Sequence, residues 1–428
     1  MKTVNLLSKA TYFISGLFIA EKRKRNIERM CEVNGDDYQG QQQFITDSPW
    51  SALEAMKIVA KKANMTLGET SGQVLLIDES SSKKAGKHSV GVSRQHNGNL
   101  GKIENSQTGV YAALAKDEHF CLVRSKLFLP EEWIADEKRC LQAGIPKSEI
   151  LFKTKPQLAI EMIKELDGEG ISYGWIGADA LYGRNYEFRD ALHKIGKKYV
   201  VDIQRDHCIY LERPHIYIPK SKTGRGRKNI HYVTDNESIT VESYKKSLEE
   251  KDWEKIQYRK GTKSPMEAHY HVREVWVWKQ GTQDSQRLTL IIKRTNGGLK
   301  YGLSNFSISE VSKEQLAYMQ GQRHLVESSF KDSKGELGLF DYQIRKYRSW
   351  YHHNALVMMA MHFVLETIIK NNVEQPLLSV RDVRLQIIAI LKDNGVLIEK
   401  EISQMKMRHK QRAYDILRRY NLTHHLII

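Results

Sequence analysis

Three acidic residues lie directly beside apolar segments of the sequence, so their carboxylates are expected at the edge of a protein core. Asp78 ends the apolar run 73–78 and Asp179 ends the apolar run 173–179, so each is expected at the end of a strand. Glu327 lies in a predicted helix, at the edge of its apolar face. Carboxylate oxygens without clustered cysteine or histidine suit Mg²⁺ or Mn²⁺ better than Zn²⁺. Two such ions about 3.5 to 4 Å apart could activate a water or a 3′-hydroxyl and stabilise the leaving oxygen of a phosphodiester.

The helix that carries Glu327 is predicted as one continuous element over residues 312–334. Ser312 and Gln315 have the spacing of a capping box, and Gly335 and Gly338 provide the stop at the other end. At about 100° per residue, one face of this helix is apolar and should pack on a core. The residues of this face are Met319, Val326, Phe330 and Leu337.

Two basic residues share the face from which Glu327 projects. Arg323 lies four residues before the acid and Lys334 seven residues after it, so the three side chains follow one line along the helix. On an arbitrary helix this spacing usually marks a row of solvated ion pairs. The chain also contains 51 acidic residues, which allow many triples. Spacing alone therefore leaves the purely structural explanation open.

The composition favours a polyanionic partner. Lys and Arg exceed Asp and Glu by 67 to 51, which gives a formal charge of +16 and a pI near 9.4. Nucleic acid is the first candidate for such a partner, and a membrane surface is the second. No apolar run reaches the roughly 18 residues of a membrane-spanning helix. The charge therefore points to DNA or RNA before lipid.

Neither an export signal nor a disulfide framework is indicated. The N-terminal segment has charges on the wrong side of its apolar part and lacks a small-residue cleavage site. The four cysteines are scattered without CxxC spacing, so a zinc site is not indicated either. We expect the protein in a reducing cytoplasm.

The pattern of apolar residues predicts a mixed α/β protein of several parts, because 428 residues exceed one ordinary core. Residues 1–70 are expected to form a helical N-terminal domain that binds DNA. Residues 71–204 and 306–370 are expected to form the two parts of one α/β core, separated by a β-rich insertion at 205–305. A basic helical segment, 371–428, completes the chain.

Three segments carry a resemblance to a known family. Residues 323–334, ArgHisLeuValGluSerSerPheLysAspSerLys, resemble the Arg-x3-Glu-x6-Lys part of the signature of DDE insertion-sequence transposases with a Tyr-Arg-Glu-Lys motif. TrpIleGlyAlaAspAlaLeuTyrGly (175–183) resembles the segment with the second Asp of that family, and LeuLeuIleAspGluSer (75–80) with residues 86–95 resembles the first. The match runs in order from about residue 45 to 365. It departs from the signature where a Tyr should lie three residues before the Arg, because Gln320 stands there and Tyr318 is two residues off.

The resemblance implies an RNase H-like mixed-sheet catalytic core with a β-rich insertion domain. It also implies that Asp78, Asp179 and Glu327 are ligands of two Mg²⁺ ions, with Mn²⁺ as a substitute. Arg323 and Lys334 would hold phosphates of the transposon end. The implied activity is metal-dependent cleavage at the ends of an insertion sequence and strand transfer into target DNA, either directly or through a hairpin. Double-stranded DNA is the implied partner, and a homodimer on DNA is expected because two ends must be paired.

Further residues are candidates for contact with DNA. Some relatives stack a flipped base on a Trp of the insertion domain, and packing within the sheet is the alternative role for such residues here. The candidates are Trp253, Trp276 and Trp278, together with Lys331 and the basic loop residues Lys222, Arg225 and Arg227. The basic segments 21–25 and 405–412 could bind either DNA or a second subunit.

Two other functions remain open from the sequence. A two-metal nuclease would cleave DNA without joining it to a target. A non-catalytic DNA-binding relic of a transposase would explain the departure at Gln320. A membrane-surface protein is a third alternative, but it would give the three acids no role.

Overall fold

The computed structural model describes residues 6–98, 100–219, 230–261, 264–375, 377–391, 402, 406–407, 409–410 and 413–418. The chain forms two compact units. Unit 1 comprises Met1–Gln73, Ile77–Tyr173 and Leu325–Ile428, and unit 2 comprises Val74–Leu76 and Gly174–His324. The boundary between them passes through strand β1 (Val74–Lys83), so this strand contributes residues to both units.

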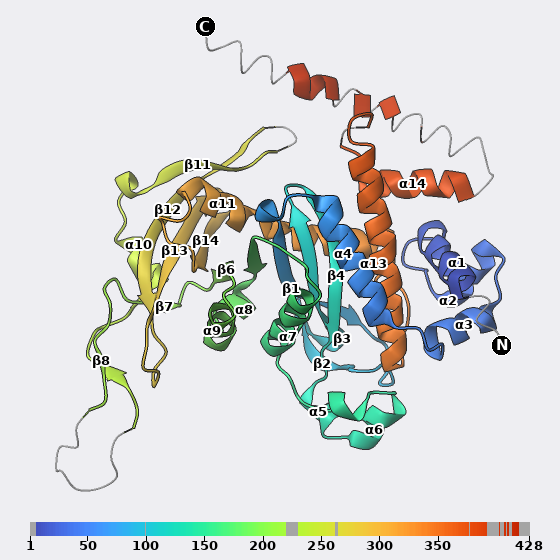
Figure 1. The fold of residues 1–428 in the computed structure, drawn as a ribbon, viewed down its shortest axis with the longest axis horizontal. Coiled ribbons are helices and arrows are strands. Elements are labelled where there is room, and N and C mark those ends of the chain that lie inside the picture. The colour runs from blue at the N-terminus through green and yellow to red at the C-terminus, as the bar shows by residue number, and fades with distance from the viewer. Residues whose placement is uncertain are drawn as a thin grey trace. The chain divides into compact units, whose positions relative to one another are not determined.

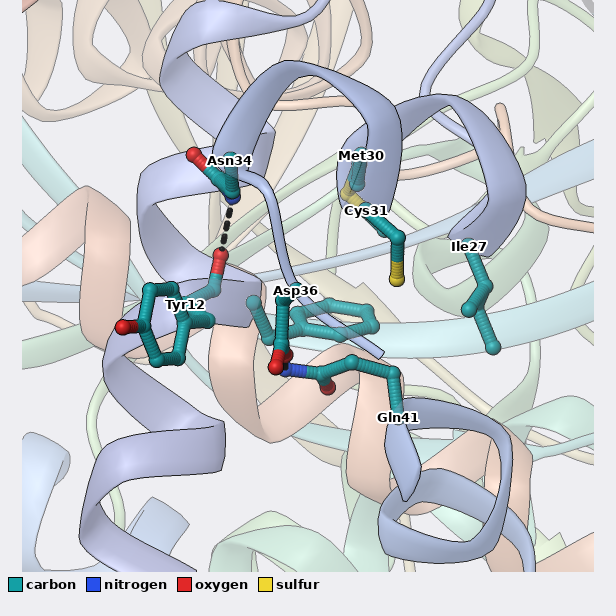
Figure 2. Close-up of a pocket in the computed structure, with 8 residues that line it drawn as sticks. Tyr12, Ile27, Met30, Cys31, Asn34, Asp36 and Gln41 are labelled. Carbon is teal, nitrogen blue, oxygen red and sulfur yellow. Dashed lines mark hydrogen bonds between the residues drawn. The ribbon is translucent and has the colours of Figure 1, made fainter. Parts of the chain in front are cut away.

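Unit 1 begins with helices whose start points follow from local capping residues. Asn26 accepts a hydrogen bond from the Arg29 backbone, and Asp37 and Ser51 cap the next two helices in the same way. These helices are α1 (Leu6–Ile19), α2 (Ile27–Asn34), α3 (Tyr38–Thr46) and α4 (Ala52–Leu67). Figure 2 shows the small pocket enclosed by α1, α2 and the start of α3, where Asn34 donates a hydrogen bond of 2.7 Å to the Tyr12 carbonyl.

The sheet of unit 1 is built from antiparallel strands. Strand β3 (Lys102–Lys116) pairs with β2 (Ser93–Asn97), with Ser93 opposite Ser106. Strand β3 also pairs with β4 (His119–Leu127). The helices that complete the unit are α5 (Glu131–Ile134), α6 (Glu137–Gln142), α7 (Lys155–Gly168), α12 (His324–Glu336), α13 (Tyr347–Lys370) and α14 (Val380–Leu391). Short 3-10 turns lie at Thr70–Gly72 and Lys147–Glu149.

Helix α13 is the central helix of unit 1. It packs along α4 and against β4, as Figure 1 shows. Fourteen of its 24 residues are buried, which explains why it is apolar on most sides. His353 is fully buried here, with Nε2 3.1 Å from the Leu339 carbonyl.

Unit 2 contains a mixed sheet in the order β11, β12, β13, β14, β6 and β5, next to Val74–Leu76 of β1. Strand β5 (Trp175–Ala178) runs parallel to β6 (Tyr199–Ile203), and the pairs from β11 through β14 to β6 are antiparallel. The other strands are β11 (Glu254–Arg259), β12 (Met266–Val277), β13 (Gln286–Thr295) and β14 (Gly298–Ser304). Two small hairpin-like sheets pair β7 (Cys208–Ile209) with β10 (Ile239–Thr240) and β8 (Ile216–Tyr217) with β9 (Val233–Thr234). The helices are α8 (Ala180–Gly183), α9 (Tyr186–Lys194), α10 (Val241–Lys246) and α11 (Lys313–Gln322), with a 3-10 turn at Glu250–Asp252.

The predicted fold class is confirmed: this is a mixed α/β protein with a large mixed sheet, consistent with an RNase H-like nuclease fold. The β-rich segment continues the sheet of unit 2, because β14 pairs directly with β6 from Tyr301 opposite Ile203. The division of the chain into five segments stays a prediction.

The prediction of one continuous helix over residues 312–334 is wrong. Helix α11 ends at Gln322 and α12 begins at His324, with Arg323 between them. The capping box of Ser312 and Gln315 is present as predicted. The buried face of α11 also differs from the predicted one, since Leu316, Ala317 and Gln320 are buried whereas Met319 is only half-buried.

The burial of His353 predicts a loss of stability in acid. Burial lowers the pKa of its imidazole from 6.5 to about 4, against the smaller opposing effect of its bond to Leu339. Between these two pKa values the unfolded chain binds a proton that the folded chain does not, so stability falls as the pH falls. From pH 7 to pH 5 we expect urea unfolding to show a loss of about 2 kcal/mol from this residue.

The matched variants are His353→Gln and His96→Gln, since His96 is exposed on β2. His353→Gln should flatten the pH dependence and His96→Gln should not. An equally steep dependence in His353→Gln would contradict the assignment.

Candidate active site

Asp78 lies within β1 directly after a fully buried apolar run, and its own side chain is half-buried. The prediction that Asp78 ends a strand is wrong, because β1 continues through the polar residues to Lys83. Its Oδ1 accepts a hydrogen bond of 2.7 Å from the Glu79 backbone. Glu79 is itself paired at 2.9 Å with Lys155 of α7. The strand thus fixes the Asp78 carboxylate through its own backbone.

Within unit 1, Lys334 of α12 interacts electrostatically with Asp78. Desolvation lowers the pKa of Lys334 from 10.5 to about 8, and the negative charge of Asp78 acts in the opposite direction. The Lys334 ammonium lies 5.2 Å from the ring centre of Phe330 and 5.0 Å from that of Phe340. Two residues that the sequence singled out from distant segments are therefore close enough to interact.

Glu327 is presented by the same helix as Lys334. Its side chain is exposed, whereas its neighbours Val326 and Phe330 are buried at 1% and 6% exposure. Phe330 packs edge-on against Tyr111 of β3 at 5.3 Å. The apolar face of α12 thus anchors the helix on unit 1 and turns the Glu327 carboxylate outward.

Asp179 lies in unit 2, where it is the first residue after β5 and caps α8. Its Oδ1 accepts a hydrogen bond of 2.9 Å from the Leu181 backbone. The turn that follows is exceptionally close to β6, because a Cβ on Gly183 would lie 1.9 Å from the Asp202 carbonyl oxygen. Only glycine fits this approach, and it fixes where α8 and its capping carboxylate stand.

Arg323 marks the end of α11 and is held by an acid that the sequence analysis missed. Its Nε lies 2.7 Å from Oδ2 of Asp202, and both side chains are less than one-fifth exposed. An acid inside the apolar run 199–203 was the available signal, of the same kind that pointed to Asp78 and Asp179. The ion pair orients the guanidinium at the break between α11 and α12.

The residue at the position of the signature Tyr is Gln320, and its side chain is buried within unit 2. Gln320 is 7% exposed, and within the described part of the chain neither its Nε2 nor its Oε1 has a hydrogen-bond partner. Its Nε2 lies 3.0 Å from where a Cβ on Gly302 would stand. Tyr318 is half-buried and packs edge-on against Trp175 at 6.2 Å. The departure from the signature therefore coincides with a core position of α11.

Two of the candidate Trp residues pack against arginines in unit 2. The guanidinium of Arg294 lies 4.4 Å from the ring centre of Trp253, and that of Arg213 lies 5.4 Å from Trp276. Trp276 also exchanges two backbone hydrogen bonds of 2.8 Å with Tyr210. Both indoles are half-buried, so each has one face in contact with the protein.

The remaining candidates differ in their surroundings. Trp278 is half-buried and donates its indole N–H to the Thr282 carbonyl at 2.9 Å. Lys331 is exposed on α12, one turn after Glu327. Lys222, Arg225 and Arg227 lie outside the described residues.

The three acids are divided between the units: Asp78 and Glu327 belong to unit 1, and Asp179 belongs to unit 2. Across the described part of the chain, no group of three or more His, Cys, Asp or Glu side chains is placed to hold a metal ion. The donor chemistry nevertheless fits Mg²⁺, because all three are carboxylates and the two Asp residues are each oriented by a backbone N–H.

A mixed sheet that carries an acid after β5 and another after the apolar part of β1, followed by a helix with Glu327, is consistent with an RNase H-like nuclease fold. The sequence model described as DDE superfamily endonuclease matches residues 5–265, and the chain belongs to this family of nucleic-acid-cleaving enzymes. The matched range contains Asp78 and Asp179. The predicted family resemblance is thereby confirmed.

One relative adds to this result. The chain is 25% identical to the probable transposase for insertion sequence element IS701 of Microchaete diplosiphon, over 332 residues that cover 77% of this chain and 75% of the relative. None of the helices in the described ranges has the length and apolar character needed to cross a membrane.

The close approach at Gly183 predicts a sensitive position behind Asp179. Gly183→Ala should force α8 away from the Asp202 carbonyl and lower the free energy of unfolding by about 3 kcal/mol or more. Gly168→Ala is the control, because no atom of the described residues lies within 4 Å of its added Cβ. This control should be neutral or stabilising by up to about 1 kcal/mol, since alanine favours a helix. Equal stability of the two variants in urea unfolding would show that β6 does not constrain α8.

Proposed function

We propose that the chain is the transposase of an insertion sequence, acting in the bacterial cytoplasm. It cleaves double-stranded DNA at the ends of the element and joins the freed 3′-hydroxyl to target DNA. The observation that carries the proposal is the interaction of Asp78 with Lys334 in unit 1, which links two residues of the predicted signature. Membership of the DDE endonuclease family and the name of the IS701 relative support the same reaction class.

Asp78, Asp179 and Glu327 are the proposed ligands of two Mg²⁺ ions, for which Mn²⁺ can substitute. Such ions, when bound, activate the attacking water or 3′-hydroxyl and stabilise the leaving oxygen. Support comes from unit 2, where Leu76 of β1 lies 2.7 Å from the Cβ position of Gly177 in β5. In the sequence, Asp78 follows Leu76 and Asp179 follows Gly177 by two residues each.

The chain's basic residues hold the DNA in this proposal. Arg323 offers a guanidinium oriented by Asp202, which suits bidentate contact with a phosphate. Lys334 lies in a partly desolvated setting, where a phosphate would stabilise its charged form. Lys331, exposed on the same helix, can follow the backbone at the next phosphate.

The insertion segment and a second copy complete the proposed assembly. Trp253, Trp276 and Trp278 are candidates to stack a flipped base if cleavage proceeds through a hairpin, and Lys222, Arg225 and Arg227 are candidates to follow the DNA backbone. Two transposon ends must be held together for joining, so we propose a homodimer on DNA.

One specific observation keeps a second function in view. Gln320 replaces the signature Tyr and is buried, so the phosphate contact expected of that Tyr is missing from its usual position. A non-catalytic DNA-binding relic is the corresponding alternative. A nuclease that cuts without joining is another, and the two assays below separate all three.

The first assay measures cleavage of the element's own terminal repeats with Mg²⁺. Glu327→Gln should lower the cleavage rate by at least about a hundredfold, because it removes a metal ligand while leaving the shape of the side chain. DNA binding should largely survive. Glu314→Gln, at an exposed acid in the first turn of α11, is the control and should cleave normally. Cleavage by Glu327→Gln at the wild-type rate would contradict the assignment.

The second assay supplies pre-cut ends with a 3′-hydroxyl and a target plasmid. A transposase should yield joined product that depends on Mg²⁺, since the same acids serve both steps. Cleavage without any joined product would support the simple nuclease instead. The absence of both, with DNA binding intact, would support the relic.

A further inference from the structure

The last turn of α12 ends in a buried acid that is held by two cations from distant parts of unit 1. Glu336 is 8% exposed and forms an ion pair with Lys22, which lies between α1 and α2. Its Oε2 also lies 3.7 Å from Nη1 of Arg384 in α14. The helix that presents Glu327 is thus tied at its far end to both the N-terminal helices and α14.

Arg25 reinforces the same end of α12. It is 0% exposed, its Nη1 lies 3.1 Å from Oδ2 of Asp341, and both terminal nitrogens lie 3.4 Å from the Gly335 carbonyl. Gly338 gives it room: a Cβ there would lie 2.6 Å from Cδ of Arg25, and its φ of +68° favours glycine. The stop signal at the end of α12 therefore also shapes the pocket for this guanidinium.

Arg384 connects this site to the end of α1. Its Nε donates to the Phe18 carbonyl at 2.8 Å and its Nη2 donates to the Ala20 carbonyl at 3.0 Å. Lys22, Arg25 and Arg384 together form what we call the α12 clamp, with Glu336 and Asp341 as its acids. The three cations meet the carbonyl end of α12, where the helix dipole favours positive charge.

The clamp gives part of segment 21–25 a role within the chain. From the sequence alone, this segment could have bound either DNA or a second subunit. Lys22 and Arg25 use their charges within the chain, while Lys24 pairs with Glu21 at 2.7 Å on the surface. Buried charges are costly unless their partners are placed well, so such a network specifies one arrangement of the elements that it joins.

We propose that the α12 clamp is a positioning device for the active site, and that Lys22, Arg25 and Arg384 are positioning residues for Glu327 and Lys334. This inference rests on the proposed function of those two residues. Glu336 lies nine residues after Glu327, so a straight helix places it about 14 Å along the same axis. Fixing the last turn therefore fixes the tilt of α12 and, with it, the position of the Glu327 carboxylate. Through the clamp, the segment between α1 and α2 fixes the orientation of α12, the helix that carries Glu327 and Lys334.

The test combines hydrogen exchange with the metal dependence of cleavage in the full chain. The variants are Glu336→Gln, which keeps the shape of the side chain, and Lys22→Met, at a site 47% exposed that cannot disturb the core. Glu32→Gln is the control, because it breaks only an exposed ion pair with Arg29 on α2. Backbone exchange of α12 and α13 is measured by mass spectrometry, and cleavage is measured over a range of Mg²⁺ concentrations.

The clamp variants should speed exchange in α12 by about tenfold with little change in α13. They should also raise the Mg²⁺ concentration for half-maximal cleavage by about tenfold, as misplacement of a ligand does. Unchanged α12 exchange, or faster exchange spread equally over unit 1 with unchanged Mg²⁺ dependence, would overturn the proposal and leave a purely structural role. If Glu336→Gln does not fold, Lys22→Met decides the question. A wild-type chain that never cleaves would refute the proposed function, while exchange would still decide whether the clamp holds α12.

Discussion

The burial of strand β1 is the constraint on which both units depend. Its residues Val74–Ile77 are each at most 1% exposed, so the run is covered on both faces and cannot tolerate a charge. The first three of these residues belong to unit 2, where Gly177 provides the close approach of β5. The strand then enters unit 1, and Asp78 is the first polar side chain after the buried run. A carboxylate at this point is thus positioned by apolar packing on one side of it and by the remaining strand on the other.

The second organising principle is the pairing of buried or half-buried cations with acids of fixed orientation. Lys334 interacts electrostatically with Asp78, and Arg323 and Arg25 form ion pairs with Asp202 and Asp341. In each case a low-dielectric setting strengthens the interaction and makes a wrong arrangement costly. Charges that are already oriented lose little freedom when a phosphate arrives, which is how a preorganised site favours the transition state over the free substrate. The basic composition thus serves the architecture as well as the expected polyanionic partner.

Local signals in the sequence were sufficient for elements that are decided locally. The box of Ser312 and Gln315 starts α11 as predicted, and the apolar run before Asp179 is strand β5. The apolar run before Asp78 is also a strand, but β1 continues to Lys83, so the position of Asp78 at a strand end was predicted wrongly. The ion pair of Arg323 was not predictable from the helical pattern, because its partner Asp202 is distant in the chain. The role of Arg25 was hidden for the same reason, since a basic run has the same composition whether it is solvated or buried against a helix end. Periodicity reports which face is apolar, but the tertiary partner decides where a helix ends and what a charge meets.

The proposed function requires Asp78, Asp179 and Glu327 to bind the same pair of metal ions. Replacing Mg²⁺ with Fe²⁺ in the DNA complex and adding ascorbate and peroxide generates radicals that cut the polypeptide near the bound ion. The account predicts cuts close to all three acids, suppressed together by excess Mg²⁺ and lost together in Asp179→Asn. Cuts near one acid that persist in Asp179→Asn, or no specific cuts at all, would contradict a shared site.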